Sequence, residues 1–236
     1  MEAREFSGFT GEAFDFLEGL SANNNREWFD AQKSTYKTAL LEPAVALVAT
    51  LGERLRAEFP HVRYDTRTNG SGSLMRIYRD VRFSEDKSPY KTQIAMMFPS
   101  GEGKKMKQPG FGLQLSVRGV ELMAGLFRFE KEGLQRYRVA VDDQQSGAEL
   151  VRACERVCAE EGYRIEGQTY KRVPRGFDTD HPRGAFLRHS GLYASAPPIA
   201  PGIVRSPELI DEALARFRHM APVEEWLVRS VFPASS

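Results

Sequence analysis

The sequence of 236 residues predicts an α+β protein in which antiparallel β-hairpins form a central sheet, flanked by N-terminal and C-terminal helices. Two observations predict this class. Apolar residues recur at helical spacing near both ends of the chain, whereas from about residue 74 they alternate with polar residues, as in half-buried strands. Helices followed by hairpins and then by helices are typical of α+β proteins. We therefore expect a single domain over residues 1–236.

The first segment, residues 1–60, is predicted to be helical. Thr10 stands where the N-cap of a first helix is expected. Asn24 is followed three residues later by Glu27, which resembles the capping box of a second helix. Pro43 suits the first turn of a third helix, because its missing N–H has no intrahelical partner there. The segment thus needs no role beyond packing.

Residues 74–130 are predicted to form β-hairpins. Residues 94–98 resume the alternation of the first strand after a stretch rich in turn formers. Two further apolar stretches on either side of Arg118 and Gly119 predict a second hairpin. The apolar residues expected on the buried face of the first strand are Met75, Ile77, Val81 and Phe83.

A helix is predicted over residues 146–161, where Cys154 and Cys158 share one face and resemble two small core residues. Residues 163–205 are rich in loop-forming residues. A Ser-Pro-Glu sequence then indicates a helix start, and residues 206–232 are predicted to hold two helices, the second one short.

The composition limits the classes of function. The net charge is +1, from 33 basic and 32 acidic residues, so the chain lacks the basic excess of non-specific nucleic-acid binders. No apolar stretch approaches the roughly 20 residues that a membrane span needs. The N-terminus shows no basic region followed by an apolar run, as a secretory signal would. We therefore expect a soluble, cytoplasmic protein with no membrane partner, for which a nucleic acid is a disfavoured partner.

The first charged motif, RIYRDVRFSEDKSPYKT at residues 76–92, holds five cations and three acids. Arg79 falls among the apolar positions of the alternation, and a buried guanidinium needs a carboxylate partner. Asp80 and Asp86 are the candidates. Arginine also matches a phosphate or carboxylate with two parallel hydrogen bonds. The motif therefore predicts either an anion-binding site or a salt-bridge ladder that fixes the register of the hairpin.

The second charged motif, YKRVPRGFDTDHP at residues 170–182, contains a Pro-Arg-Gly turn. His181 follows two carboxylates, so it is a candidate general base, and equally a loop histidine that faces water. No GxSxG, P-loop, HExxH or dinucleotide-binding sequence is present, and no two histidines lie at metal-ligand spacing. The sequence therefore predicts no metal site and leaves the cofactor unknown.

Three motifs in this order, NNNREWF, YRDVRFSEDKSPYKT and YKRVPRGFDTDHP, resemble a family of bacterial and fungal proteins called domain of unknown function 2461. The likeness extends from about Phe6 to Trp226. It implies a single soluble α+β domain and no activity that can be carried over. If the two charged motifs meet, their cations repel one another, and an anionic ligand would relieve that repulsion. The rim of this anion-binding site would be formed by Asn23, Asn24, Asn25, Trp28 and Tyr90.

Three hypotheses follow. In the first, a small phosphorylated or carboxylated ligand is bound, with or without hydrolysis or transfer, and Asp80, Asp86 or His181 would move the proton in such a reaction. In the second, the chain is a non-catalytic module that binds an acidic protein segment or single-stranded nucleic acid through the loop containing residues 104–107. In the third, the charges are purely structural. The cations expected to bind the anion in the first hypothesis are Arg76, Arg79, Arg82, Lys87, Lys91, Arg172 and Arg175.

Overall fold

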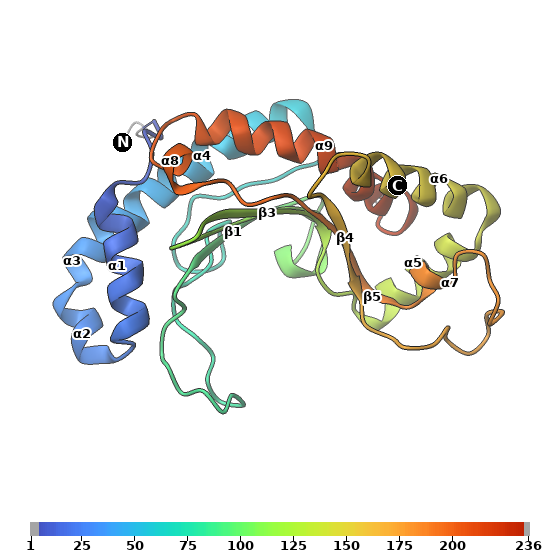
Figure 1. Cartoon of the computed structure of the whole chain (residues 1–236), viewed down its shortest axis with the longest axis horizontal. Coiled ribbons are helices and arrows are strands. Elements are labelled where there is room, and N and C mark those ends of the chain that lie inside the picture. The colour runs from blue at the N-terminus through green and yellow to red at the C-terminus, as the bar shows by residue number, and fades with distance from the viewer. Residues whose placement is uncertain (1–4, 234–236) are drawn as a thin grey trace. The chain divides into compact units, whose positions relative to one another are not determined.

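The computed structural model describes residues 5–233 and confirms the α+β class (Figure 1). Within this range, five strands form an antiparallel sheet in the order β1-β2-β3-β5-β4. The ends of the expected domain, residues 1–4 and 234–236, lie outside the described residues. The strands are β1 (Ile94–Pro99), β2 (Gly110–Ser116), β3 (Gly119–Leu126), β4 (Arg164–Gln168) and β5 (His189–Ser195). The helices are α1 (Gly11–Ala22), α2 (Arg26–Ala31), α3 (Lys33–Thr35), the π-helix η1 (Tyr36–Leu41), α4 (Glu42–Glu58), the 3-10 helix η2 (Lys105–Lys107), α5 (Lys131–Asp142), α6 (Gln144–Cys158), α7 (Gly184–Leu187), α8 (Pro201–Val204) and α9 (Leu209–Ser230).

The chain divides into two compact units. Unit 1 comprises Met1–Phe98, Gly112–Glu121 and Pro198–Leu214. Unit 2 comprises Pro99–Phe111, Leu122–Pro197 and Ala215–Ser236. The first charged motif therefore belongs to unit 1 and the second to unit 2. The expectation of one domain over the whole chain stays a prediction.

The N-terminal helices of unit 1 form where the sequence predicts them, but their caps differ. Thr10 occupies the N-cap position of α1, yet its side chain makes no capping hydrogen bond. Helix α2 is capped by Asn25, whose Oδ1 accepts a hydrogen bond from the N–H of Trp28 at 2.9 Å. The prediction that Asn24 is the cap was therefore wrong by one residue, and the Asn24 side chain is available for a more distant partner.

Helix α4 starts directly after the π-helix η1, and Pro43 lies in its first turn. Proline has no N–H and its ring clashes with the carbonyl group four residues earlier, so a helix that runs through Pro43 must kink or widen. The π-helix provides the wider turn, in which the N–H of Glu42 donates to the carbonyl oxygen of Lys37, five residues before it. The predicted third helix is therefore a continuation of the helical segment before it.

The first hairpin of unit 1 is antiparallel but irregular. Leu74 pairs with Met96 and Tyr78 pairs with Tyr90, each as an isolated bridge. Between these bridges the chain advances four positions on one side, from 74 to 78, and six on the other, from 90 to 96. The two extra residues make a bulge, so only β1 is a regular strand and the strand predicted before it is reduced to bridges. Figure 1 shows this hairpin extending beyond β1.

The prediction for the tip of this hairpin was wrong. Phe83 was expected on the buried face, but its side chain lies outside the paired region and is 96% exposed. The hairpin pairing extends to Arg79, whose N–H donates to the carbonyl oxygen of Pro89 at 2.9 Å. Beyond Arg79 the alternation of apolar and polar residues no longer predicts which side chains are buried.

The hairpin formed by β2 and β3 is confirmed, whereas other elements were not predicted. Strands β4 and β5 pair antiparallel, with Ile165 opposite Ala194, in a stretch interpreted as rich in loops. Helix α5 was also missed. The end of the chain holds one helix, α9, with Pro222 inside it, instead of two helices. Short strands carry little periodic signal, and their neighbours in the sheet determine whether they form.

The two cysteines of α6 differ, contrary to the expectation of two core thiols. Cys154 is buried, and Cys158 is exposed. Burial, with smaller contributions from Cys158 and Glu155, raises the pKa of the Cys154 thiol to about 12. Among residues 5–233 no cluster of three histidine, cysteine or acidic side chains could hold a metal ion. No helix in that range has the length and apolar character of a membrane span.

Iodoacetamide is therefore expected to modify Cys158 in the folded protein and to leave Cys154 unmodified, because the thiolate is the nucleophile and Cys154 is both buried and protonated. Mass spectrometry of peptides after timed labelling at neutral pH measures this difference. In denaturant both thiols should react. Equal labelling rates in the folded protein would contradict the placement of Cys154.

Candidate anion-binding site

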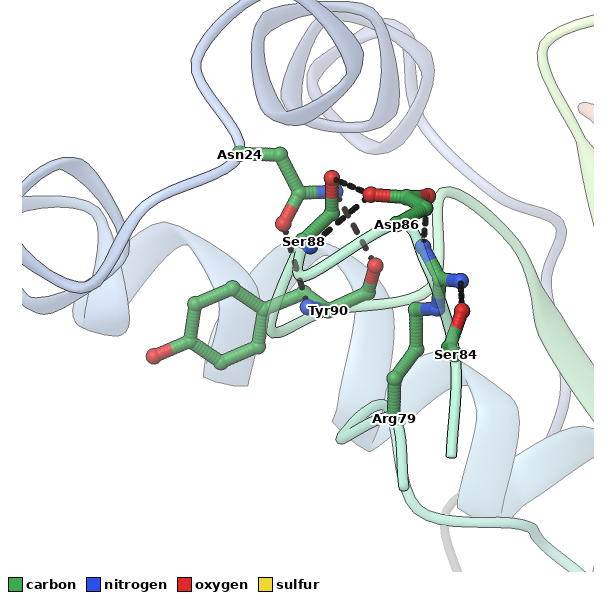
Figure 2. Close-up of polar contacts among 6 residues, drawn as sticks. All are labelled: Asn24, Arg79, Ser84, Asp86, Ser88 and Tyr90. Atoms are coloured by element: carbon green, nitrogen blue, oxygen red, sulfur yellow. Dashed lines mark hydrogen bonds and ion pairs between the residues drawn. The ribbon is translucent and has the colours of Figure 1, made fainter. Parts of the chain in front are cut away.

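Asn24 fastens the base of the first hairpin to the connection between α1 and α2. Its Nδ2 donates to the carbonyl oxygen of Tyr90 at 2.9 Å, and the N–H of Tyr90 donates to its Oδ1 at 3.0 Å (Figure 2). One side-chain amide thus satisfies both backbone groups of Tyr90, as a neighbouring strand would. Both bonds are part-buried, so losing Asn24 leaves polar groups poorly solvated.

Arg79 pairs with Asp86 on the same hairpin (Figure 2). Its Nη1 donates to Oδ2 of Asp86, and Nη2 donates to Oγ of Ser84 at 3.5 Å. The other carboxylate oxygen of Asp86 accepts from the N–H and the hydroxyl of Ser88 at 2.9 and 2.6 Å. Arg79 first, and then Ser88, hold the pKa of Asp86 well below its usual range. The predicted carboxylate partner of Arg79 is therefore present.

The ion pair between Arg79 and Asp86 is only partly buried. The side chain of Arg79 is 28% exposed and that of Asp86 is 58% exposed. The loss of about 3–5 kcal/mol expected for a fully buried pair does not apply to such a pair. Partly exposed pairs contribute about 1 kcal/mol or less. The structural hypothesis therefore accounts for the geometry of this pair without assigning it a large share of the stability.

Arg82 and Asp80 form a second pair, at the exposed end of the hairpin. Nε and Nη2 of Arg82 donate to the two carboxylate oxygens of Asp80 at 2.9 and 2.7 Å. These bonds lower the pKa of Asp80 to about 2. A general base works best when its pKa lies near the working pH, and arginines hold the pKa values of Asp80 and Asp86 well below it. The proton-transfer roles predicted for Asp80 and Asp86 stay predictions.

The remaining cations of the motif have no carboxylate partner among the described residues. Lys87 Nζ donates to the carbonyl oxygen of Val81 at 3.0 Å. Lys91 Nζ donates to the carbonyl oxygen of Arg76, also at 3.0 Å. Burial, and then the charge of Arg76, lowers the pKa of Lys91. Arg76 and Lys91 are therefore two like charges held close together.

A glycine leaves room for the side chain of Arg76. Gly70 has a φ of +89°, and a Cβ built on it would lie 2.8 Å from Nε of Arg76. The side chain of Arg76 therefore lies directly against the backbone of residue 70. A larger residue there would be strained and would also displace the guanidinium.

The second charged motif lies in unit 2, where His181 has both ring nitrogens occupied. Nδ1 accepts a hydrogen bond from the N–H of Arg183 at 3.0 Å, and Nε2 lies 3.2 Å from Oδ1 of Asp142. The side chain is 10% exposed, so it does not face water. Arg183 also donates to the carbonyl oxygens of Val141 and Asp142 at 2.6 and 2.8 Å, at the end of α5. This arrangement fixes the loop, and the role of His181 as general base stays a prediction.

Arg172 and Arg175 are exposed in the same loop. Neither makes a hydrogen bond or an ion pair with another described residue.

The structure places the predicted site residues in two groups. Seven lie on the hairpin of unit 1: Arg76, Arg79, Asp80, Arg82, Asp86, Lys87 and Lys91. Three lie on the loop of unit 2: Arg172, Arg175 and His181. The expected meeting of the two motifs stays a prediction.

Sequence reasoning overlooked Tyr78. The side chain is 56% exposed, and its ring lies 5.5 Å from that of Tyr90, the residue fastened by Asn24. The available signal was the alternation, which places Tyr78 on the same strand face as Arg76. The alternation does not show which ring packs beneath it.

Comparison with known proteins identifies one family. The model of the DUF2461 family, described as a conserved hypothetical protein, matches residues 12–226. The match includes both charged motifs and the Asn-rich connection before α2. No curated protein matches the sequence.

Replacing Asn24 by alanine is expected to lower the free energy of unfolding of unit 1 by about 1–3 kcal/mol, since two part-buried backbone groups lose their partner. The matched control is Asn23→Ala, because Asn23 makes one exposed bond, to the carbonyl oxygen of Gly19 at 3.0 Å. Amide hydrogen exchange at Tyr90 measures the local effect and urea denaturation the global one. Equal losses in the two variants, or unchanged protection of the Tyr90 amide, would contradict this role of Asn24.

Proposed function

Since the chain belongs to the DUF2461 family, whose description names no activity, we propose a function from its own residues. The hairpin over residues 76–91 binds a small phosphorylated or carboxylated ligand, with Arg76 and Lys91 as its main contacts. The proposal concerns binding and depends on no catalytic step.

One observation carries this proposal. Arg76 and Lys91 lie close together, and no carboxylate among residues 5–233 neutralises either one. Like charges held together repel, and an anion placed between them converts that repulsion into attraction. Charge-assisted hydrogen bonds to a phosphate or carboxylate are the strong ones in proteins. Because Lys91 is partly withdrawn from water, its bond to an anion is screened less than one at a fully exposed lysine.

The other cations of the hairpin have secondary roles in this proposal. Arg79 and Arg82 already hold Asp86 and Asp80, so they contribute less to the binding of a further anion. Lys87 is bound only to a carbonyl oxygen and keeps donors for a ligand. The contributions predicted for Arg172 and Arg175 stay predictions.

The double variant Arg76→Gln/Lys91→Gln is expected to weaken binding of a phosphorylated or carboxylated ligand by about 100-fold or more, since each of the two charge-assisted hydrogen bonds contributes about 1.5–3 kcal/mol. A panel of such compounds, screened by thermal shift, gives the ligand, and isothermal titration calorimetry gives the dissociation constants. Inorganic phosphate and acetate serve as the minimal probes.

The control for this experiment is Arg54→Gln/Arg56→Gln, in α4 of the same unit. It removes the same charge, but its arginines pair with Asp211 and Glu53. Binding by this variant should be within about twofold of the wild type, because exposed, paired arginines contribute little at a distance. If both double variants weaken binding equally, or if no compound of either class binds the wild type, the proposal fails.

A second candidate function, binding of an acidic protein segment or single-stranded nucleic acid, is favoured by Phe83. The ring is 96% exposed, and the guanidinium of Arg82 lies 5.9 Å from its centre. Exposed aromatic rings beside cations bind such partners through stacking and charge.

This candidate predicts that Phe83→Ser weakens binding of a labelled acidic peptide or oligonucleotide about tenfold in a fluorescence anisotropy titration. Phe127→Ser is the control, because Phe127 is also exposed (60%) but lies in unit 2. Identical binding by the wild type and the Phe83 variant would eliminate the second candidate and leave the first untouched.

A further inference from the structure

Three aromatic rings of unit 1 form a cluster that reaches from the core to the surface. Phe29 is 2% exposed and stacks on Tyr90, with ring centres 4.1 Å apart and planes inclined by 14°. Tyr90 is 4% exposed, and its ring lies 5.5 Å from that of Tyr78. Tyr78 also lies 6.1 Å from Phe29 and is 56% exposed. Of the three residues in this cluster, two are buried and the third, Tyr78, is more than half exposed.

The exposed ring of Tyr78 is held in place by its contacts with the hairpin and with buried rings. Tyr78 and Tyr90 are bridge partners across the hairpin, which fixes the spacing between their backbones. Asn24 holds both backbone groups of Tyr90 (Figure 2). The ring of Tyr36 belongs to the same cluster, 5.3 Å from that of Phe29, and burial, with the nearby Tyr78, raises the pKa of its hydroxyl to about 12. A ring supported in this way loses little freedom when a ligand covers it.

The cations of the proposed anion site are next to this ring. Arg76 precedes Tyr78 by two residues, and the side chains of both are exposed. Lys91 follows Tyr90 directly, and its ammonium group reaches the backbone of Arg76. An exposed aromatic ring and two cations without carboxylate partners among the described residues therefore lie within one short stretch of the hairpin.

From this geometry we propose that the ligand of the hairpin is a nucleoside phosphate, whose base stacks on Tyr78 and whose phosphate binds Arg76 and Lys91. This inference rests on the proposed function, because it needs the same two cations, and it adds the class of ligand. A base and its 5′-phosphate are separated by one ribose, which suits a ring and a cation that are only two residues apart in the chain. Stacking on an aromatic ring tolerates all bases, so the hairpin discriminates nucleotides from sugar phosphates and not one base from another.

The test uses three probes with the full chain: adenosine 5′-monophosphate, ribose 5-phosphate and adenosine, each titrated by calorimetry. The nucleotide is expected to bind about 5- to 100-fold more tightly than ribose 5-phosphate, which is the contribution of one stacked base. Tyr78→Leu should lower nucleotide affinity to the level of ribose 5-phosphate and leave ribose 5-phosphate unchanged. Tyr78→Phe should keep the nucleotide affinity, because the ring is retained.

The control variant is Phe127→Leu, which removes an exposed ring of unit 2 and should leave nucleotide affinity unchanged. Near-ultraviolet circular dichroism and the Tyr90 amide exchange rate check that Tyr78→Leu keeps the hairpin folded. If it does not, Tyr78→Phe and the comparison of probes on the wild type still decide the question.

The outcomes separate this inference from the proposed function. Equal affinity for the nucleotide and ribose 5-phosphate in the wild type overturns the stacking inference and leaves the anion site standing. Loss of affinity for both probes in a folded Tyr78→Leu protein also overturns it, because the ring would then act on the anion site itself. If adenosine binds as tightly as the nucleotide, or if neither phosphorylated probe binds, this inference is overturned, and the proposed function fails as well only if no phosphorylated or carboxylated compound of the panel binds.

Discussion

The two hydrogen bonds between the Asn24 side chain and the backbone of Tyr90 fix the position of the charged hairpin in unit 1. A two-stranded hairpin is marginally stable in water by itself, and this one has isolated bridges and a bulge in place of a regular ladder. Phe29 stacks on the ring of Tyr90, so the same residue is fastened through its backbone and its side chain. The placement of Arg76, Tyr78 and the ion pairs follows from this attachment.

The charges of the hairpin then divide into two groups with different physical meaning. Asp86 pairs with Arg79, and Asp80 pairs with Arg82. These are the ion pairs that the structural hypothesis requires. Arg76 and Lys91 remain without a carboxylate among the described residues, and the proposed anion site depends on them. The structural hypothesis and the anion-binding proposal are therefore compatible, because each concerns different residues of the motif.

The second charged motif illustrates how far sequence reasoning reached. The side chain of His181 beside Asp178 and Asp180 suggested a general base, but its carboxylate neighbour is Asp142, which lies nearly forty positions earlier in the chain. Asp178 instead accepts the N–H of Asp180 at 2.9 Å, a local turn that the sequence spacing allowed. Residues adjacent in sequence thus predicted the local turn at Asp178 correctly. They did not predict the carboxylate that contacts the His181 imidazole.

By itself the sequence determined the α+β class, the N-terminal helices, the second hairpin and the need of Arg79 for a carboxylate, because periodicity and charge spacing are local properties of the chain. It could not determine β4 and β5, since each forms by pairing with a strand distant in sequence. Only the tertiary structure decided that Asn24 binds Tyr90 instead of capping α2, and that Tyr78 stays exposed above a buried stack. Both outcomes depend on contacts between residues 49 to 66 positions apart in the sequence, where no local pattern specifies the contact.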